Sequence, residues 1–174
     1  MTIGVRHVLC FLVLAGTLAS CTGRGARPGV EQMSAADAAQ RAEVVRAAER
    51  LFEGMRTRDT AVLRTLLAPE LVIVAARGDG SGVTIRTQNA ADFLRAVASS
   101  KTELRERLWD PDVHIDGAIA VLWAPYDFHL GEQFSHCGHD AFQLARGDRG
   151  WYVTGLTYTV HTTGCTGAPS SGRG

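Results

Sequence analysis

The spacing of hydrophobic residues divides the chain into a helical part and a later β part. After Ser34, a residue type that often caps helices, apolar residues recur every three or four positions as far as Met55, which predicts an amphipathic helix of about six turns. A short helix is expected over 60–67. It should end before Pro69, because proline disfavours helical backbone at the residue that precedes it. Asn89 is expected to cap a third helix.

The other apolar segments predict strands, over 71–76, 83–86, 103–115, 118–129, 134–146 and 151–162. The dipeptide Asp116-Gly117 is typical of a two-residue hairpin turn. Pro111 is expected to bulge or split the first of the four long strands, because proline cannot donate to a sheet. Helices followed by a long antiparallel meander indicate an α+β fold, with a curved sheet around the helices.

The first 20 residues have the layout of a secretory signal. Arg6 precedes an apolar run over 8–19, and about 12 residues are too short to span a hydrocarbon core of about 30 Å. The run ends at 18–21 with Leu-Ala-Ser-Cys, which resembles the lipobox of bacterial lipoproteins. That resemblance implies cleavage before Cys21 and attachment of lipid to it. The alternative is an ordinary secretory signal with a chance cysteine.

These patterns predict four segments. They are a lipoprotein signal peptide (1–20), a lipidated Cys21 with a flexible tether (21–33), one folded domain (34–165) and a disordered tail rich in Gly and Ser (166–174). The expected location is extracytoplasmic, anchored through the lipid to the bacterial cell envelope, at the outer membrane or the cell surface.

The composition argues against two classes of protein. Hydrophobic residues make up 45% of the 174 positions, and 18 basic side chains balance 18 acidic ones. The apolar content is too high for a disordered chain, and the charge is too balanced for a polybasic nucleic-acid binder. We therefore expect no nucleic acid as a partner.

The cysteines predict one disulfide. Cys10 leaves with the signal peptide and Cys21 would carry lipid, so that Cys137 and Cys165 remain in an oxidising compartment. In the sheet register derived below, Cys165 lies five residues beyond the partner of Cys137. A bridge therefore requires the chain to turn back, which Thr163-Gly164 permits.

The order of the elements resembles the nuclear transport factor 2-like (NTF2-like) superfamily, which includes SnoaL-like and lumazine-binding-like proteins. Three segments carry the likeness, 123–128 (Trp-Ala-Pro-Tyr-Asp-Phe), 135–138 (Ser-His-Cys-Gly) and 150–153 (Gly-Trp-Tyr-Val). The resemblance implies a cone-shaped roll over 34–165, in which a curved, mostly antiparallel sheet wraps around a long N-terminal helix and two shorter ones. The superfamily includes isomerases, dehydratases, cyclases and ligand-binding modules, so the fold alone does not fix a function.

Symmetric hairpin turns predict the register of the last three strands. If Leu130 faces Gln133 and Arg146 faces Trp151, one concave face carries a polar set suited to ligand binding: Trp123, Asp127, His136, Asp140, Thr157 and His161. Asp127, His136 and His161 then form one row, in which Asp127 and His136 are a candidate catalytic acid–base pair. The alternatives are a metal ion held by the two histidines and the aspartate, a purely structural pair, or a one-residue slip that moves the set to the other face.

We expect neither a metal nor a cofactor. His136 and His139 point to opposite faces of a strand, and no second set of ligands has the spacing of a zinc site. The sequence also contains no phosphate-binding loop and no nucleophile-elbow motif.

Three functions remain open. The favoured one is a small-molecule binding module that takes an apolar or aromatic ligand. The others are an isomerase, dehydratase or cyclase that uses Asp127 and His136, and a non-catalytic envelope interaction protein. The opposite face of the sheet is predicted to be apolar, with Tyr126, Phe128, Cys137, Ala141, Tyr152, Leu156, Tyr158 and Val160. Because proteins of the resembled fold often dimerise through that side, we expect a homodimer.

Overall fold

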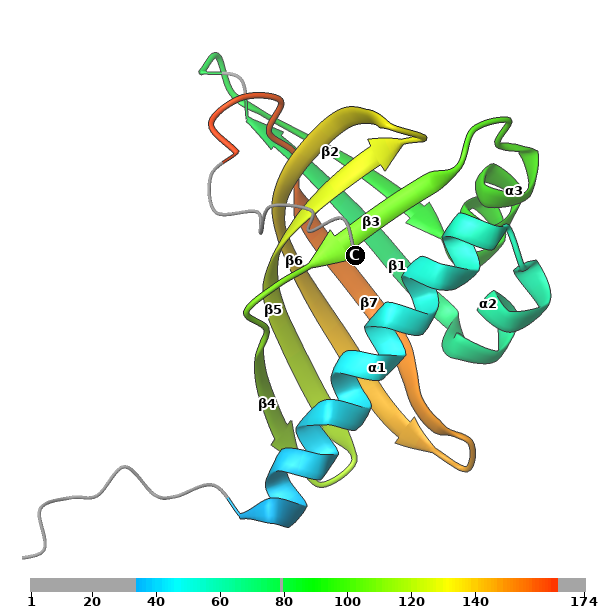
Figure 1. Cartoon of the computed structure of the whole chain (residues 1–174), viewed down its shortest axis with the longest axis vertical. Coiled ribbons are helices and arrows are strands. Elements are labelled where there is room, and N and C mark those ends of the chain that lie inside the picture. Colours follow the sequence, from blue (N-terminus) through cyan, green and yellow to red (C-terminus); the bar gives the residue numbers. More distant parts are fainter. Residues whose placement is uncertain (1–33, 79, 166–174) are drawn as a thin grey trace, which may run out of the picture. The chain divides into compact units, whose positions relative to one another are not determined.

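The computed structural model describes residues 34–78 and 80–165 (Figure 1). The predicted signal peptide (1–20), the tether with Cys21 (21–33) and the tail (166–174) lie outside the described residues and stay predictions. The described elements are α1 (Ala35–Thr57), α2 (Thr60–Leu66), β1 (Leu67–Gly78), β2 (Val83–Asn89), α3 (Ala90–Ser99), β3 (Leu104–Leu108), β4 (Asp112–Asp116), β5 (Ile119–Leu130), β6 (Gln133–Gly147) and β7 (Gly150–Thr159). None of these helices is both long and apolar enough to cross a membrane.

The helices begin where the sequence predicts. The Ser34 side chain accepts a hydrogen bond from the backbone N–H of Asp37 at 3.1 Å, and α1 then runs to a left-handed residue, Arg58, with φ 56°. Asp59 caps α2 and Asn89 caps α3 in the same way. One stripe of α1 is buried, comprising Val44, Ala47, Ala48, Leu51, Phe52 and Met55. This stripe packs against the concave face of the sheet, across which α1 lies diagonally in Figure 1.

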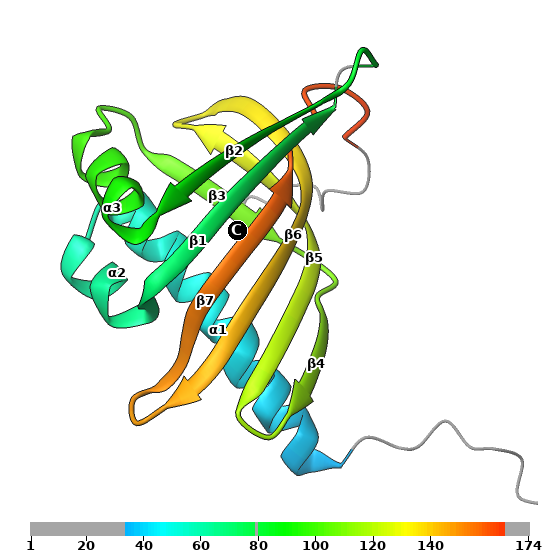
Figure 2. The same ribbon diagram turned by 180° about the vertical axis from the view of Figure 1, so that it is seen from behind.

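A seven-stranded sheet has the order β2-β1-β7-β6-β5-β3, with β4 also paired to β5. The pair β1–β7 is parallel and all the other pairs are antiparallel, so the sheet is mixed. As predicted, the strand expected over 103–115 is split at Pro111 into β3 and β4. Figure 2 shows the strands from behind, with α1 on their far side. This arrangement confirms the predicted α+β roll.

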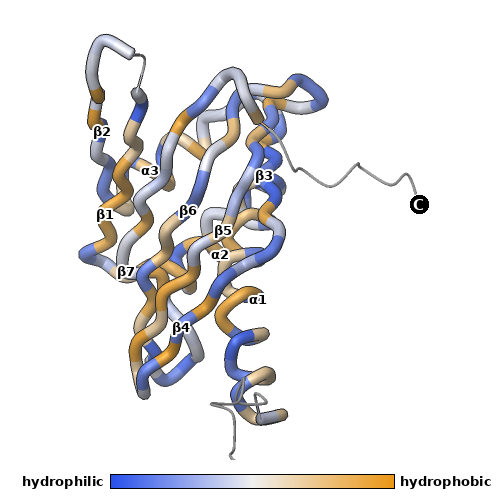
Figure 3. The backbone as a smooth tube through the Cα atoms, turned by 90° about the vertical axis from the view of Figure 1, so that its left-hand side faces the viewer, coloured by the Kyte–Doolittle hydropathy of each residue, from blue (hydrophilic) through white to orange (hydrophobic). Residues whose placement is uncertain are grey.

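The core lies between α1 and the concave face. Figure 3 shows hydrophobic and hydrophilic positions alternating along α1 and the strands, as expected for elements with one buried face. Phe52 on α1 meets Phe142 on β6 edge to face, with ring centroids 6.0 Å apart. On β5 the buried apolar residues are even-numbered ones, Ala120, Leu122, Ala124 and Tyr126.

Two β-bulges change the predicted register. Both turn pairs are as predicted, since Leu130 faces Gln133 and Arg146 faces Trp151. Beyond the turns, Ser135 is an extra residue on β6 and Thr154 an extra residue on β7. Each bulge places two residues of one strand opposite one residue of its partner, so every later pair shifts by one position.

The shift exchanges the faces of β5 and of the second half of β7. The inward face predicted for β6, from Leu144 to His136, is correct, and so are Trp151 and Val153 on β7. The predicted inward residues of β5 point outward, and three of them are exposed: Ile119 (63%), Val121 (46%) and Trp123 (51%).

The same shift removes the basis on which a dimer face was predicted. Tyr126, Phe128, Leu156 and Tyr158, which were expected on the outer face, line the inner one. The homodimer stays a prediction.

Candidate functional site

A cavity of about 360 Å³ lies between α1, α3 and the concave face of the sheet. This volume falls within the range of small-molecule sites. Its walls are mostly aliphatic and aromatic, comprising Leu51, Phe52, Met55, Ile73, Phe93, Ala96, Val97, Leu104, Tyr126, Phe128, Leu156 and Tyr158. The polar lining residues are Gln88, Ser100, Glu106 and His136.

Two carboxyl groups meet in the wall of this cavity. Glu106 on β3 lines it, and Asp140 on β6 lies behind it with none of its surface exposed. The two side chains share a hydrogen bond when one of them is protonated, and as ionised carboxylates the oxygens of Asp140 have no partner in the part of the chain that the structure describes. If both carboxyls were ionised, two negative charges would lie side by side where water cannot solvate them. This cost favours uptake of a proton by the pair.

The electrostatics of the pair follow from that burial. Burial raises the pKa of Asp140 to about 7. Burial, and next the negative charge of Asp140, raise the pKa of Glu106 well above its ordinary value. The pair therefore retains at least one proton near neutral pH, so it can both donate and accept a hydrogen bond.

Three rings lie next to the pair. The Tyr126 hydroxyl donates to the backbone oxygen of Thr159 at 2.8 Å, and its ring meets those of His136 and Tyr158 at 5.8 and 6.0 Å. Burial and the nearby carboxyls raise the pKa of both tyrosines, which keeps the phenols protonated.

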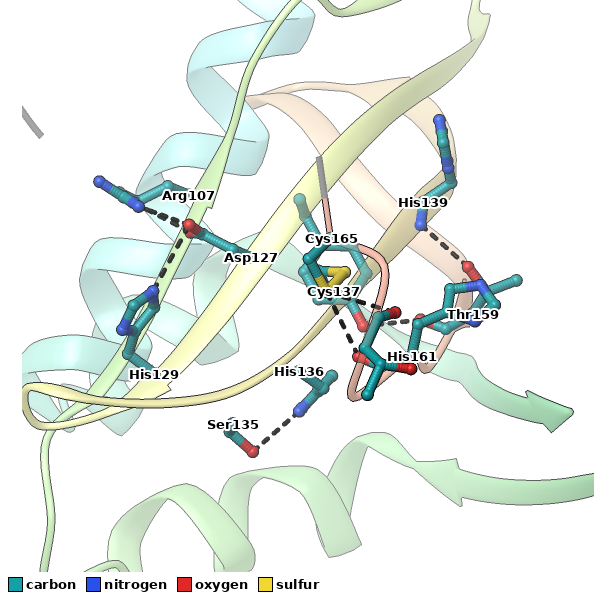
Figure 4. Close-up of a disulfide and its surroundings, with 12 residues drawn as sticks. Arg107, Asp127, His129, Ser135, His136, Cys137, His139, Thr159, His161 and Cys165 are labelled. Carbon is teal, nitrogen blue, oxygen red and sulfur yellow. Dashed lines mark hydrogen bonds and ion pairs between the residues drawn. A yellow bond between two sulfur atoms is a disulfide. The ribbon is translucent and has the colours of Figure 1, made fainter. Parts of the chain in front are cut away.

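His136 is held by a neighbour on its own strand. Its Nδ1 lies 3.0 Å from the hydroxyl of Ser135 (Figure 4). Burial, and next the positive charge of Arg77, lower the pKa of His136, so a neutral imidazole faces the cavity.

Asp127 belongs to a different cluster. It lies opposite Cys137 rather than His136, and the Arg107 guanidinium donates two hydrogen bonds to it, the one from Nε at 2.9 Å. His129 Nε2 lies 3.4 Å from the same carboxylate (Figure 4). Burial alone would raise the pKa of Asp127, but Arg107 and His129 outweigh it and hold that pKa below its usual value.

The predicted row of Asp127, His136 and His161 is therefore wrong. His161 pairs with Cys137, and the bulge at Ser135 moves His136 out of the row. The geometry removes the predicted acid–base pair, because Asp127 is an ion-paired carboxylate away from the cavity.

The six predicted ligand-binding residues separate into three groups. His136 lines the cavity and Asp140 lies behind it. Trp123, Thr157 and His161 are exposed residues outside the cavity lining, with Trp123 stacked on the ring of His139 at 5.0 Å. Asp127, the sixth, lies with Arg107.

Sequence reasoning missed Glu106, Tyr126 and Tyr158. Glu106 did leave a signal, since it alternates with Leu104 and Leu108 and so shares their face of a strand. A lone carboxylate on an apolar face is unusual enough to indicate a site. The two tyrosines had been assigned to the outer face by the incorrect register.

The predicted disulfide is confirmed. Cys137 and Cys165 are bonded, with their Cα atoms 5.9 Å apart. The chain turns back between them, and Gly164 adopts φ 75° in this turn. Within the described ranges, no group of three or more His, Cys, Asp or Glu side chains is arranged to hold a metal ion.

No protein-family model matches the sequence, and no curated protein matches it. Solved structures share its architecture. An NTF2-like protein from Cytophaga hutchinsonii is 18% identical with a TM-score of 0.59, over 70% of this chain and 98% of that one. An NTF2-like superfamily protein from Salmonella enterica is 14% identical with a TM-score of 0.57, over 76% and 98%.

A candidate dehydratase of the NTF2-like family from Streptomyces avermitilis is 17% identical with a TM-score of 0.55, over 72% of this chain and 99% of that one. At such identities the likeness concerns the backbone and carries no residue roles. Together with the long helix laid across a curved sheet, it establishes that this chain has the NTF2-like fold.

Proposed function

We propose that the protein binds a small, largely apolar molecule in the cavity between α1, α3 and the sheet. The observation that carries this proposal is the cavity of about 360 Å³, whose mostly apolar walls include one carboxyl, that of Glu106. Glu106 shares a hydrogen bond with the fully buried Asp140, so the pair offers the cavity a hydrogen-bonding group. A ligand with one polar group among apolar ones would fit such a lining.

A cavity-filling variant tests this proposal. Ala96 and Ala98 on α3 are both exposed, but Ala96 lines the cavity and Ala98 does not. Native mass spectrometry of the protein purified without denaturation should show a bound small molecule. Ala96→Trp should lose that molecule, and Ala98→Trp, the matched control, should keep it. Equal retention by both variants would contradict the proposal.

A second candidate function is acid–base catalysis by Glu106 and Asp140. The raised pKa of each group is the specific observation in its favour, because two carboxyls that share a proton can transfer it at neutral pH. This pair replaces Asp127 and His136 in the enzymatic alternative.

The Glu106→Gln variant distinguishes the two functions. A binding module should retain the same molecule in the variant as in the wild type, with an unchanged mass. An enzyme should accumulate unreacted substrate in the variant, so the mass of the bound molecule would differ. The third alternative, an interaction protein with a filled cone, fits poorly with an open cavity of about 360 Å³.

We also propose that Cys21 carries lipid and tethers the domain to the bacterial cell envelope. The support is the lipobox-like segment 18–21 after a short apolar run. The intact mass of the cellular protein should show loss of 1–20 and added acyl groups. Cys21→Ala should abolish the added mass, whereas Cys10→Ala should leave it unchanged.

A further inference from the structure

A second hollow adjoins the cavity at the end of the β1–β2 hairpin. Its volume is about 490 Å³, and it is lined by Ala75, Arg77, Thr84, Arg86, His136, Tyr158 and Val160. His136 and Tyr158 line the apolar cavity as well. The two spaces therefore meet at these two rings, one space apolar and the other bearing two arginines.

The sheet register explains why the arginines lie there. Ala75 faces Arg86 on β2 and Tyr158 on β7, while Arg77 faces Thr84. Residues 73, 75 and 77 share one face of β1, and Ile73 lines the apolar cavity. The same face thus leads from Ile73 to Arg77 over about 13 Å of strand. Figure 2 shows this hairpin extending beside β7.

The two guanidinium groups have charge to offer a ligand. None of the ion pairs between described residues involves Arg77 or Arg86, and both residues are exposed. The charge of Arg77 reaches the cavity, since it acts on both His136 and Tyr126. The cavity therefore has an acidic group of residues at Glu106 and Asp140 and a basic rim at Arg77 and Arg86.

We propose that the ligand is an amphipathic anion, whose apolar body fills the cavity and whose carboxylate or phosphate lies between Arg77 and Arg86. This inference rests on the proposed binding function. Guanidinium groups bind such oxyanions through paired N–H donors. The carboxyl pair meets an anionic group with a neutral acid or with like charge, whereas the rim meets it with two guanidinium groups, so the charged end of the ligand lies at the rim.

Three probes with one apolar body test the ligand class. They are 2-naphthoate, 2-naphthylmethanol and 2-naphthylmethylammonium, measured by isothermal titration calorimetry against the full protein. We expect 2-naphthoate to bind at least tenfold more tightly than the alcohol, and the ammonium compound to bind no better than the alcohol. A fourth probe, 2-naphthyl phosphate, decides between a carboxylate and a phosphate as the preferred anion.

A double variant tests the residues. Arg77→Gln with Arg86→Gln should lower the affinity for 2-naphthoate about tenfold and leave that for 2-naphthylmethanol unchanged. Arg64→Gln, an exposed arginine on α2, is the matched control and should change neither.

The outcomes separate this inference from the proposed function. If the alcohol binds as tightly as both anions, the basic rim plays no part and the inference fails, while the cavity still binds small molecules. If the ammonium probe binds most tightly, the carboxyl pair selects the ligand and the inference is wrong. If no probe binds, the proposed function fails as well.

Discussion

At the scale of single residues, Asp140 makes the stability of the protein depend on pH. Its pKa is about 7 in the fold against an ordinary value of 3.8, so the folded chain holds a proton that the unfolded chain releases between these values. The free energy of unfolding should therefore fall as the pH rises from about 4 through about 7. Besides burial, Glu106 from β3 acts on Asp140 through a side-chain hydrogen bond that lowers its pKa, and the charge of Asp140 in turn raises the pKa of Tyr126 and Tyr158.

Asp140→Asn should remove the part of that dependence that Asp140 contributes, while Glu106, whose pKa burial also raises, keeps its own part. We expect the variant to be more stable than the wild type at pH 8 by about 1–3 kcal/mol, because it leaves no buried charge. Urea unfolding followed between pH 5 and pH 8 measures the effect. Glu70→Gln, an exposed carboxyl on β1, is the control and should keep the slope of the wild type. An Asp140→Asn variant that is less stable at pH 8 would contradict this account.

Gly138 permits a close approach of β6 and β7. A Cβ atom at this position would lie 2.1 Å from the backbone oxygen of Thr159, which also accepts the Tyr126 hydroxyl. Gly138→Ala should therefore destabilise the fold by about 1–3 kcal/mol, as overpacking usually does. Gly82→Ala, where a Cβ would meet nothing within 4 Å, should have little effect. Chemical denaturation curves of both variants provide the measurement.

At the scale of elements, the predictions succeeded where a local signal exists. Caps and apolar spacing located α1 and α3, Pro69 marked the end of α2, and turn residues located the hairpins β4–β5, β5–β6 and β6–β7. The bulges at Ser135 and Thr154 have no such signal, since both residues are ordinary within strands. One extra residue reverses every later side chain. This reversal explains why Asp127 was placed in the cavity and Tyr126 outside it.

Deleting Thr154 should therefore leave the register of β7 unchanged. Without the extra residue, Val153 would still face Leu144 and Gly155 would still face Gln143, so that Leu156 and Tyr158 would stay on the inner face. We expect the deletion to keep a cooperative thermal transition in circular dichroism. Thr154→Ala loses only a hydrogen bond from the threonine hydroxyl to the backbone oxygen of Gln143, and should cost about 0.5–1.5 kcal/mol. Loss of the cooperative transition in the deletion variant would mean that the fold needs the bulge itself.

At the scale of the whole molecule, the sequence indicated the roll but not the way in which its first and last strands meet. The parallel pairing of β1 with β7 joins segments about 80 residues apart, which no local pattern records. That pairing places Ala75 beside Tyr158 and so brings the arginine hairpin to the end of the cavity. The ligand site thus depends on a long-range contact, whereas its individual walls belong to predicted elements.

The disulfide attaches the chain that follows β7 to β6. Cys137 and Cys165 close a loop with a sequence separation of 28, and His161 exchanges two backbone hydrogen bonds with Cys137 at 2.8 and 2.9 Å. Cys165→Ser should lower the free energy of unfolding by about 2–4 kcal/mol, because a bridged loop restricts the unfolded chain. Urea denaturation measures this change, and reduction of the wild type should reproduce it.

Cys165→Ser should also lower the local stability of the strand end beside the basic rim at Arg77 and Arg86. Tyr158 and Val160 line the hollow that holds Arg77 and Arg86, and they lie a few residues before Cys165 in the chain. Loss of the bridge therefore frees the strand end next to them. Hydrogen exchange should then accelerate at the amides of Cys137 and His161, while amides in the middle of β6, such as that of Phe142, keep their protection. Uniform acceleration along β6 would instead mean that the bridge stabilises the sheet as a whole, and not this end of it.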